Sequence, residues 1–411
     1  MNARKNLIFG LCLGSAILGL LFATYGYVNT WRLWNIPVAM PPFMDVRVIT
    51  AGAEAHRQGI DPMLSNPTDS SQRRLNYPRI WQGLYRLVVG PGQDIPIGVV
   101  SMLLFGTGLV VFVPRISTAG VGLMLAAVFS PAVMLGVERG NTDLLMFFLL
   151  ALAVAAARRG TILAVALVLF AFVLKLFPLL GLAVVLGKRR GVVIKSFAIA
   201  AVLATLYVWF SFDDLRRISA ATPRDTWLSY GLNVLWMKVA GADAGAGYWV
   251  RISSYALVLA AAGWAGLAGR RAPPEGKAPE GIHLNAFRVG AAFYIGTFLL
   301  GNNFVYRFMF LIFAIPQLGE WAGGAAVDRP RMWASRVALI GMYVAMWSML
   351  IDRFLQAWPW GAFFLGEAGA WALFGALVQL LFASGPEWMV QPARKWLTVA
   401  AAAAMAPGHP D

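Results

Sequence analysis

Acidic side chains are scarce in this chain, so their positions single out candidate sites of chemistry. The sequence has 411 residues, with 19 Asp and Glu against 34 Lys and Arg. Asp45 follows a Pro-Pro pair and begins a stretch that predicts a short amphipathic helix. An Asp there can cap the helix, because it accepts hydrogen bonds from the free N–H groups of the first turn. It can also act as a general base towards a hydroxyl group within reach.

A second polar group interrupts the apolar sequence about a third of the way along the chain. Glu138, Arg139, Asn141 and Asp143 lie close together between two apolar runs. One interpretation is a solvated turn with an Arg–Asp pair, in which Asn141 caps the next helix. The other is a binding site, because acids are rare in the rest of the chain. The sequence leaves both open.

Three cations are candidates for a phosphate site. Lys175 lies within an apolar run, with Pro178 three residues later, and an intramembrane cation is costly and often functional. A lysine near the interface can alternatively extend its amine towards water. Arg307 lies near the outer end of a later run, and Arg139 is predicted on the same side. Such a cluster suits a phosphate or diphosphate group, since Arg binds phosphate through two hydrogen bonds and Lys as a point charge.

Long apolar runs must position these residues. The chain is 59% hydrophobic and 13% charged, and its runs are too continuous for the alternation of a barrel. We therefore expect an all-α, polytopic helical membrane protein with about 12 transmembrane helices. The runs lie near residues 7–28, 97–113, 120–137, 144–157, 161–174, 177–186, 192–210, 248–267, 287–300, 304–318, 337–351 and 363–382.

Charge predicts how these runs are oriented. With a cytoplasmic N-terminus and twelve spans, every loop assigned to the inside is basic, as the positive-inside rule expects. Both termini are then cytoplasmic, and we expect a multi-pass protein of the bacterial cytoplasmic (inner) membrane. Loop placement accounts for most of the net charge of +15, so no nucleic-acid partner is predicted.

The chain is expected to form a single transmembrane domain over residues 1–385. Residues 29–96 form a long non-cytoplasmic loop with short interfacial helices, and residues 211–247 form another long outside segment. The Pro/Gly-rich residues 270–285 predict a cytoplasmic linker, and residues 386–411 a disordered cytoplasmic tail.

Several familiar sites are missing from the sequence. There is no P-loop to indicate ATP, no G-x-S-x-G elbow, and no His or Cys cluster among three His and one Cys to indicate zinc. No cofactor is predicted, and a divalent-metal requirement stays open.

The order of motifs resembles a known superfamily. An Asp in the first outside loop is followed by "GIDP" (59–62), "NYPRI" (76–80), "GN" before a Leu-rich run and "LKLFP" (174–178). This order resembles the GT-C superfamily of polytopic glycosyltransferases, most closely glycosyltransferase family 87. The chain departs from the family pattern at "DPM" in place of "DPY" and "ERGN" in place of "GQ-x-N".

The resemblance implies a GT-C-like fold and sugar transfer on the non-cytoplasmic side of the bilayer. The donor would be a polyprenyl-phosphate sugar of hexosyl or mannosyl type, and the acceptor a lipid or glycan of the cell envelope. Transfer would invert the anomeric centre, with Asp45 as general base. The candidate substrate-binding residues are Arg47, Asn76, Tyr77, Arg79, Glu138, Arg139, Asn141, Asp143, Lys175 and Arg307.

A transporter or flippase of a lipid-linked or anionic substrate is the alternative function, because it could use the same cations. Transporters often show paired halves with matching broken helices. Only one broken-helix candidate, at Lys175, is evident in this sequence, and this favours the enzyme.

The topology predicts that Ser71 faces the outside. A cysteine introduced by Ser71→Cys is therefore expected to react with a membrane-impermeant thiol reagent in intact cells. Labelling that requires cell lysis would place the 29–96 loop on the inside and refute the predicted orientation.

Overall fold

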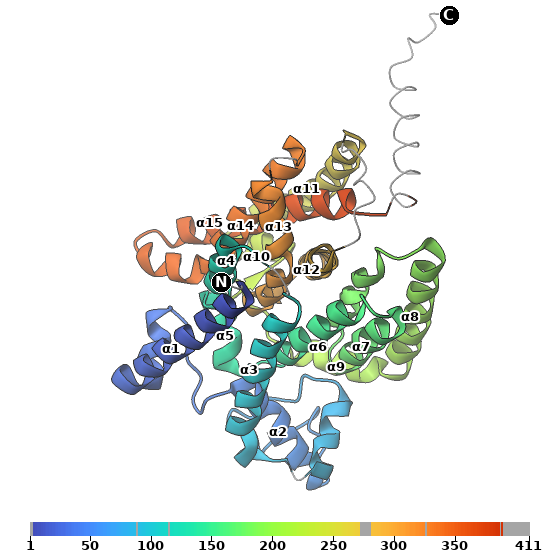
Figure 1. Cartoon of the computed structure of the whole chain (residues 1–411). Coiled ribbons are helices and arrows are strands. Elements are labelled where there is room, and N and C mark those ends of the chain that lie inside the picture. The colour runs from blue at the N-terminus through green and yellow to red at the C-terminus, as the bar shows by residue number, and fades with distance from the viewer. Residues whose placement is uncertain are drawn as a thin grey trace, which may run out of the picture.

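The computed structural model describes residues 3–87, 89–113, 116–271, 281–324, 327–386 and 388. The described chain is all-α apart from one pair of two-residue strands (Figure 1). The predicted tail at 386–411 and the predicted linker at 270–285 lie largely outside these residues.

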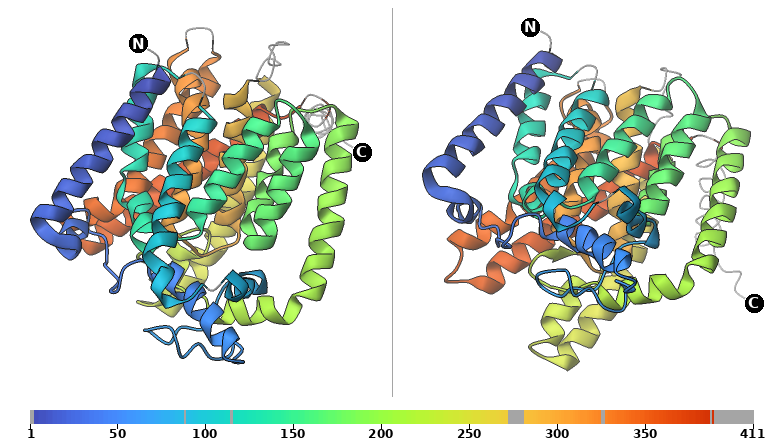
Figure 2. Two further views of the ribbon diagram at one scale, coloured as in Figure 1. Left: turned by 60° about the horizontal axis from the view of Figure 1, so that its bottom comes forward. Right: turned by 90° about the horizontal axis from the view of Figure 1, so that it is seen from below.

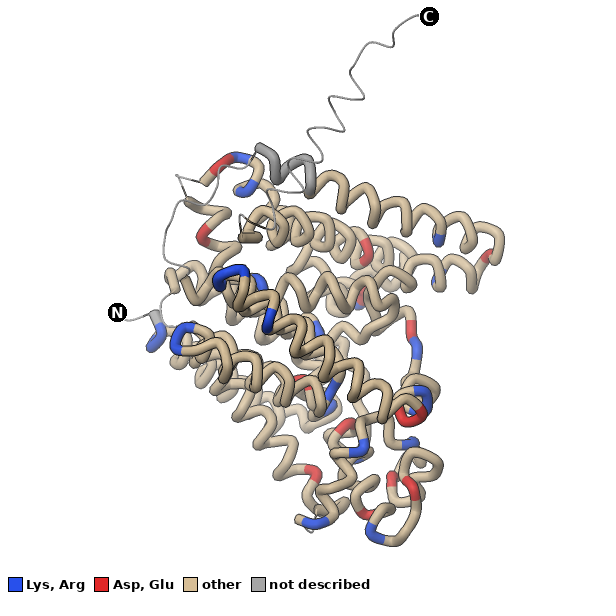
Figure 3. Tube along the Cα trace, turned by 90° about the vertical axis from the view of Figure 1, so that its right-hand side faces the viewer, with Lys and Arg blue, Asp and Glu red and all other residues tan. Residues whose placement is uncertain are grey.

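Five helices are long and apolar enough to cross a membrane, which indicates a multi-pass membrane protein. They are α1 (Ala3–Leu33), α3 (Asp94–Val111), α8 (Arg190–Phe210), α14 (Arg329–Phe354) and α15 (Pro359–Ala383). A sixth span is formed if α4 (Thr118–Val128) and α5 (Pro131–Arg139), which meet at a bend of 52°, are counted together. Charged residues gather towards the ends of the helices and in the loops, whereas the helix bodies are mainly uncharged (Figure 3).

The expected count of twelve spanning helices is wrong for the described residues. The runs near 144–157 and 161–174 form helices of only 14 residues, α6 (Asp143–Ala156) and α7 (Thr161–Leu174). Two further runs form irregular 3₁₀ helices of 9 and 10 residues, η3 (Phe177–Val185) and η4 (Val305–Ala314). A lone helix needs about 20 residues to cross the bilayer, and these four segments are all shorter than that.

The segment η4 lies inside the bundle, whereas α7 and α8 leave large apolar side chains exposed at its periphery. Every residue of η4 is buried, whereas only three residues of α8 are. Two views show α1 and α8 at opposite edges of the bundle (Figure 2). Helices α11 (Ala244–Arg271), α12 (Ile282–Leu299) and α13 (Ile315–Gly323) complete this part of the fold.

Aromatic rings fill the centre of the bundle. Phe293 stacks on Phe310 with ring centroids 3.8 Å apart, and Phe147 stacks on Phe313 at 4.4 Å. Offset stacking favours such pairs beyond the burial of their apolar area. The rings thereby pack η4 between α6 and α12.

The first loop forms a small subdomain against the end of the bundle. It contains α2 (Met44–Arg57), η1 (Arg79–Leu87) and η2 (Pro91–Gln93). Val48 and Ile49 of α2 pack with Met63, Leu75 and Tyr77 in a separate apolar cluster. The expected short helices are therefore present, although η1 is a 3₁₀ helix that packs on α2.

Asp45 does not cap α2, so that interpretation is wrong. The N-cap is Phe43, which has a left-handed backbone conformation with φ 60° and no side-chain cap. Asp45 lies in the first turn, where a carboxylate still interacts favourably with the positive end of the helix.

A small antiparallel ribbon closes the same end of the bundle. β1 (Ser229–Tyr230) pairs with β2 (Asn303–Phe304), with Ser229 opposite Phe304. Gly231 has φ +125°, and a Cβ there would approach the carbonyl oxygen of Gly301 to 2.5 Å. Only glycine fits this turn, which continues into α10 (Val234–Ala240).

Two tertiary contacts place the ends of distant helices side by side. Asn35, just after α1, donates to the carbonyl of Met349 at 2.7 Å, and Arg353 donates to that of Arg32 at 2.9 Å. The turn between α14 and α15 therefore lies at the end of the bundle where α1 ends and the first loop begins.

Candidate functional site

A cavity of about 460 Å³ opens beneath the first loop. Its walls come from α2, the segment 73–78, the outer end of α5, the break between α7 and η3, helix α9 (Phe212–Ala221) and the ribbon. Six of the predicted site residues line it: Asp45, Asn76, Tyr77, Arg139, Lys175 and Arg307.

The floor of the cavity is organised by a buried carboxylate. Asp143, which is 1% exposed, pairs with Lys175 Nζ at 2.8 Å and with Arg307 Nε at 3.5 Å. Lys175 is the extended residue between α7 and η3, so the helix break delivers its amine to Asp143. A charge removed from water requires such a partner. The alternative in which Lys175 extends towards the interface is thereby excluded.

Asn141 joins this buried ion pair to Asp45. Its Oδ1 accepts a hydrogen bond from Lys175 Nζ at 3.1 Å, and its Nδ2 donates to Asp45 Oδ2 at 2.5 Å. The Asp45 side chain is 20% exposed, so one face of the carboxylate reaches the cavity. The side-chain amide of Asn141 therefore bridges the carboxylate of Asp45 and the ammonium group of Lys175.

The solvated-turn interpretation of residues 138–143 is wrong, because Glu138, Asn141 and Asp143 are all buried. Asn141 does not cap the next helix, because the N-cap of α6 is Thr142; its Oδ1 accepts from the backbone N–H of Asp143 at 2.9 Å. Glu138 pairs with Arg139 at 3.1 Å and accepts from the backbone N–H of Ala39 at 2.8 Å. Arg139 thus reaches the cavity wall with its charge partly neutralised.

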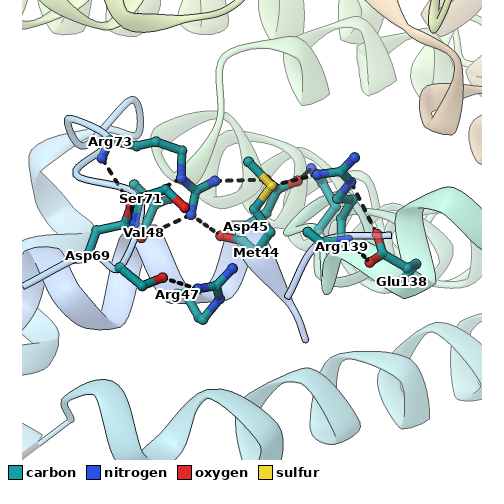
Figure 4. A network of polar contacts seen from close by, with 12 residues as sticks. Met44, Asp45, Arg47, Val48, Asp69, Ser71, Arg73, Glu138 and Arg139 are labelled. Carbon is teal, nitrogen blue, oxygen red and sulfur yellow. Dashed lines mark hydrogen bonds and ion pairs between the residues drawn. The ribbon is translucent and has the colours of Figure 1, made fainter. Parts of the chain in front are cut away.

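Arg73 links Asp45 to the rest of the first loop (Figure 4). It forms an ion pair with Asp69 at 3.0 Å, donates to the carbonyl of Met44, and lies 3.8 Å from Asp45 Oδ1. Asp69 also accepts from the backbone N–H groups of Ser71 and Arg73 at 3.2 and 3.0 Å. Burial raises the pKa of Asp69, but these hydrogen bonds outweigh it and hold the pKa below its usual value.

Two predicted site residues lie away from the cavity. Arg47 projects from another side of α2, where it contacts Ser70 and lines a separate hollow with Asp94 (Figure 4). Arg79 bridges Asp61 at 3.1 Å and Asp214 of α9 at 2.7 Å. These two arginines stabilise the first loop and its contact with α9, and they do not meet the other predicted residues.

Several cavity residues were not predicted as site residues. Arg73, Arg74, Phe177, Asp225, Asn302, Asn303 and Tyr306 also line the cavity. Asn302 and Asn303 lie five and four residues before Arg307, and that proximity in the sequence was an available signal. No local sequence pattern marked Asp225 as a cavity residue, because its position depends on the turn that leads into the ribbon. In that turn the backbone carbonyl of Asp225 accepts a hydrogen bond from Asn302 Nδ2 at 2.7 Å.

The lining carries more positive than negative charge. Five cations line the cavity, Arg73, Arg74, Arg139, Lys175 and Arg307, against two acids, Asp45 and Asp225, with Asp143 below. Among the described residues no three His, Cys, Asp or Glu side chains gather to hold a metal ion. Leu176, Phe177, Leu215 and Ile218 give the cavity an apolar side. This combination suits an amphipathic molecule with an anionic group.

The Asp69–Arg73 pair is expected to hold the first loop in place. Asp69→Asn removes the charge from a wholly buried side chain, and we expect a local loss of about 1–3 kcal/mol. The folded-state pKa of Asp69 is lowered, so its contribution is present above about pH 4 and is lost as the pH falls through the folded-state value. Hydrogen exchange of residues 44–87 between pH 6 and pH 3 measures both effects.

Asp213→Asn is the matched control, because Asp213 is an exposed acid on α9 outside the cavity. Loop protection that stays equal in the Asp69→Asn protein and the wild type would show that the pair does not hold the loop.

Comparison of this chain with protein-family models, curated proteins and solved structures finds no match.

Proposed function

We propose that this chain is an integral-membrane glycosyltransferase that uses a polyprenyl-phosphate sugar and transfers on the side of the bilayer where the first loop lies. The observation that carries the proposal is the bridge through Asn141, which holds the Asp45 carboxylate next to the Lys175 ammonium group. The resemblance in motif order to family 87 supports the same reaction class.

The proposed reaction needs a carboxylate base and a cationic group close to each other. An acceptor hydroxyl oxygen attacks the anomeric carbon, and the bond from that carbon to the phosphate oxygen breaks on the opposite face, with inversion. Asp45 takes the hydroxyl proton as the new glycosidic bond forms. The leaving lipid phosphate carries away the electron pair of the broken bond, and Lys175 and Arg307 stabilise its charge.

The surroundings of the two groups agree with an amphipathic donor. Phe177 lies beneath the Arg307 guanidinium at 3.9 Å, and Leu215 and Ile218 of α9 line the same side. An isoprenoid chain can lie along these apolar side chains while its phosphate meets the cations. The acceptor would then approach from the open side, where Asp45 and Arg74 are exposed to solvent.

Asp45→Asn tests the role of the carboxylate. The amide keeps the size of the side chain but cannot take a proton, so we expect turnover to fall by about 10²–10⁴-fold. Purified protein is assayed for sugar transfer from a panel of polyprenyl-phosphate sugars, with melting temperature and donor binding measured in parallel. The expected outcome is lost turnover with near-normal folding and donor binding.

Asp213→Asn is again the control and should retain wild-type turnover. If Asp45→Asn turns over at the wild-type rate, Asp45 is not the base and the alternative transporter function gains support.

The three predicted phosphate ligands are tested by Lys175→Ala, Arg139→Ala and Arg307→Ala. Each change removes a charged hydrogen bond worth roughly 1.5–3 kcal/mol, so donor affinity is expected to fall about 10- to 100-fold. Acceptor affinity should change less. Equilibrium binding of a polyprenyl phosphate gives the measurement.

Arg86→Ala is the matched control for these three variants, since Arg86 is an exposed cation of η1 outside the cavity. Equal loss of donor and acceptor affinity in all three variants would contradict a phosphate site.

A further inference from the structure

A second cavity lies on the other face of the β1–β2 ribbon. It has a volume of about 220 Å³ and is walled by the ribbon, α10, η4, α14 and α15. The two strands are divided between the cavities: Ser229 and Tyr230 of β1 line the second one, whereas Asn303 and Phe304 of β2 line the Asp45 cavity. The ribbon therefore lies between them.

Two buried polar atoms in this second cavity have no hydrogen-bond partner within the described part of the chain. They are Oε2 of Glu367, a residue that is 6% exposed, and Oγ of Ser229, a residue that is 7% exposed. The indole N–H of Trp371, one turn along α15, lies beside the Glu367 carboxyl group without a well-formed hydrogen bond to Oε2. Buried polar groups are nearly always hydrogen-bonded, so each of these atoms calls for an explanation.

Glu367 is the only charged side chain in the 25 residues of α15. A carboxyl group inside an apolar helix is costly, and such residues usually serve a substrate or an ion pathway. No cation lies within ion-pair distance of Glu367 in the described residues. A bound molecule that hydrogen-bonds to Glu367 and Ser229 would account for both orphaned atoms.

The other lining residues restrict the chemistry of that molecule. Glu367 and Asp352 disfavour an anion, and Asp352 is already bonded to Trp227 Nε1 at 3.2 Å. Lys238, held over the rings of Trp360 and Phe363 at 5.6 and 5.7 Å, disfavours a cation. Neutral hydroxyl groups can donate to a carboxyl oxygen and accept from a serine.

Aromatic side chains complete a site suited to a sugar. Phe308 and Phe363 line the cavity, and Trp227 lies exposed at its mouth. The volume is below the roughly 300–1,000 Å³ of a drug-sized pocket, so one ring fits better than a chain of rings. We propose that this cavity binds a neutral polyhydroxylated ring, a sugar or a cyclitol, through Glu367 and Ser229. The site stands on its own geometry and does not require the transfer reaction.

Binding is tested with the full-length protein in nanodiscs made without glycolipid or sugar detergent. Saturation-transfer NMR uses methyl β-D-glucopyranoside, methyl α-D-mannopyranoside and myo-inositol as probes. We expect at least one probe to bind saturably, and Glu367→Leu to weaken it at least tenfold. The same variant should melt at or above the wild-type temperature, because an apolar side chain replaces a buried acid.

The control is Gln379→Leu. Gln379 is a polar side chain of α15 that lies outside this cavity, so its replacement should leave binding intact. Ser229→Ala should weaken binding several-fold, and it replaces Glu367→Leu as the test if that protein fails to fold. Asp45→Asn should bind the probe normally, which separates this site from the proposed reaction. Tighter binding of octyl than of methyl glucoside would identify a lipid-borne ring, and equal binding a free one.

Two results would overturn the proposal. One is the absence of saturable binding by all three probes to the wild-type protein. The other is equal binding by the Glu367→Leu and Gln379→Leu proteins. Glu367 would then be a structural partner of Trp371.

Discussion

The buried carboxylate of Asp143 is the constraint on which the outer half of the bundle depends. Away from water, an unpaired charge is far more costly than in solution, and its attraction to a partner is stronger. Asp143 is paired with Lys175 and Arg307, which come from the α7–η3 break and from η4. The ion pairs therefore bring three segments of the chain to one point, and Lys175 reaches it because α7 ends at Leu174.

Polar contacts spread from this point to the surface. Asn141 carries the connection to Asp45, and Arg73 continues it to Asp69 in the first loop. Side-chain exposure increases along this chain of contacts, from the enclosed Asp143 to the partly exposed Asp45. A rigid inner end and a solvent-accessible outer end suit a site that must hold one group still while another molecule arrives.

The β1–β2 ribbon gives this end of the protein two chemical environments. Ser229 and Tyr230 of β1 line the cavity of Glu367, whereas Asn303 and Phe304 of β2 line the cationic cavity. The next segment, η4, contributes to both, with Tyr306 and Arg307 in the cationic cavity and Phe308 in the other. The close approach of Gly231 to Gly301 lets the ribbon turn between the helices without widening the wall.

Composition and local pattern determined the membrane class, the all-α architecture and the break at Lys175, because each depends on the chemistry of neighbouring residues in the chain. They also identified Asp45, Asn141, Asp143, Lys175 and Arg307, since polar groups in apolar runs are conspicuous. They did not determine the number of long spans, because hydropathy cannot distinguish a lipid-facing helix from a short apolar segment enclosed by others. Only the tertiary structure could place Arg47 and Arg79 outside the cavity and Arg73 beside Asp45, or bring Glu367 and Ser229 to one cavity. These arrangements depend on contacts between residues far apart in the chain, for which the local sequence carries no signal.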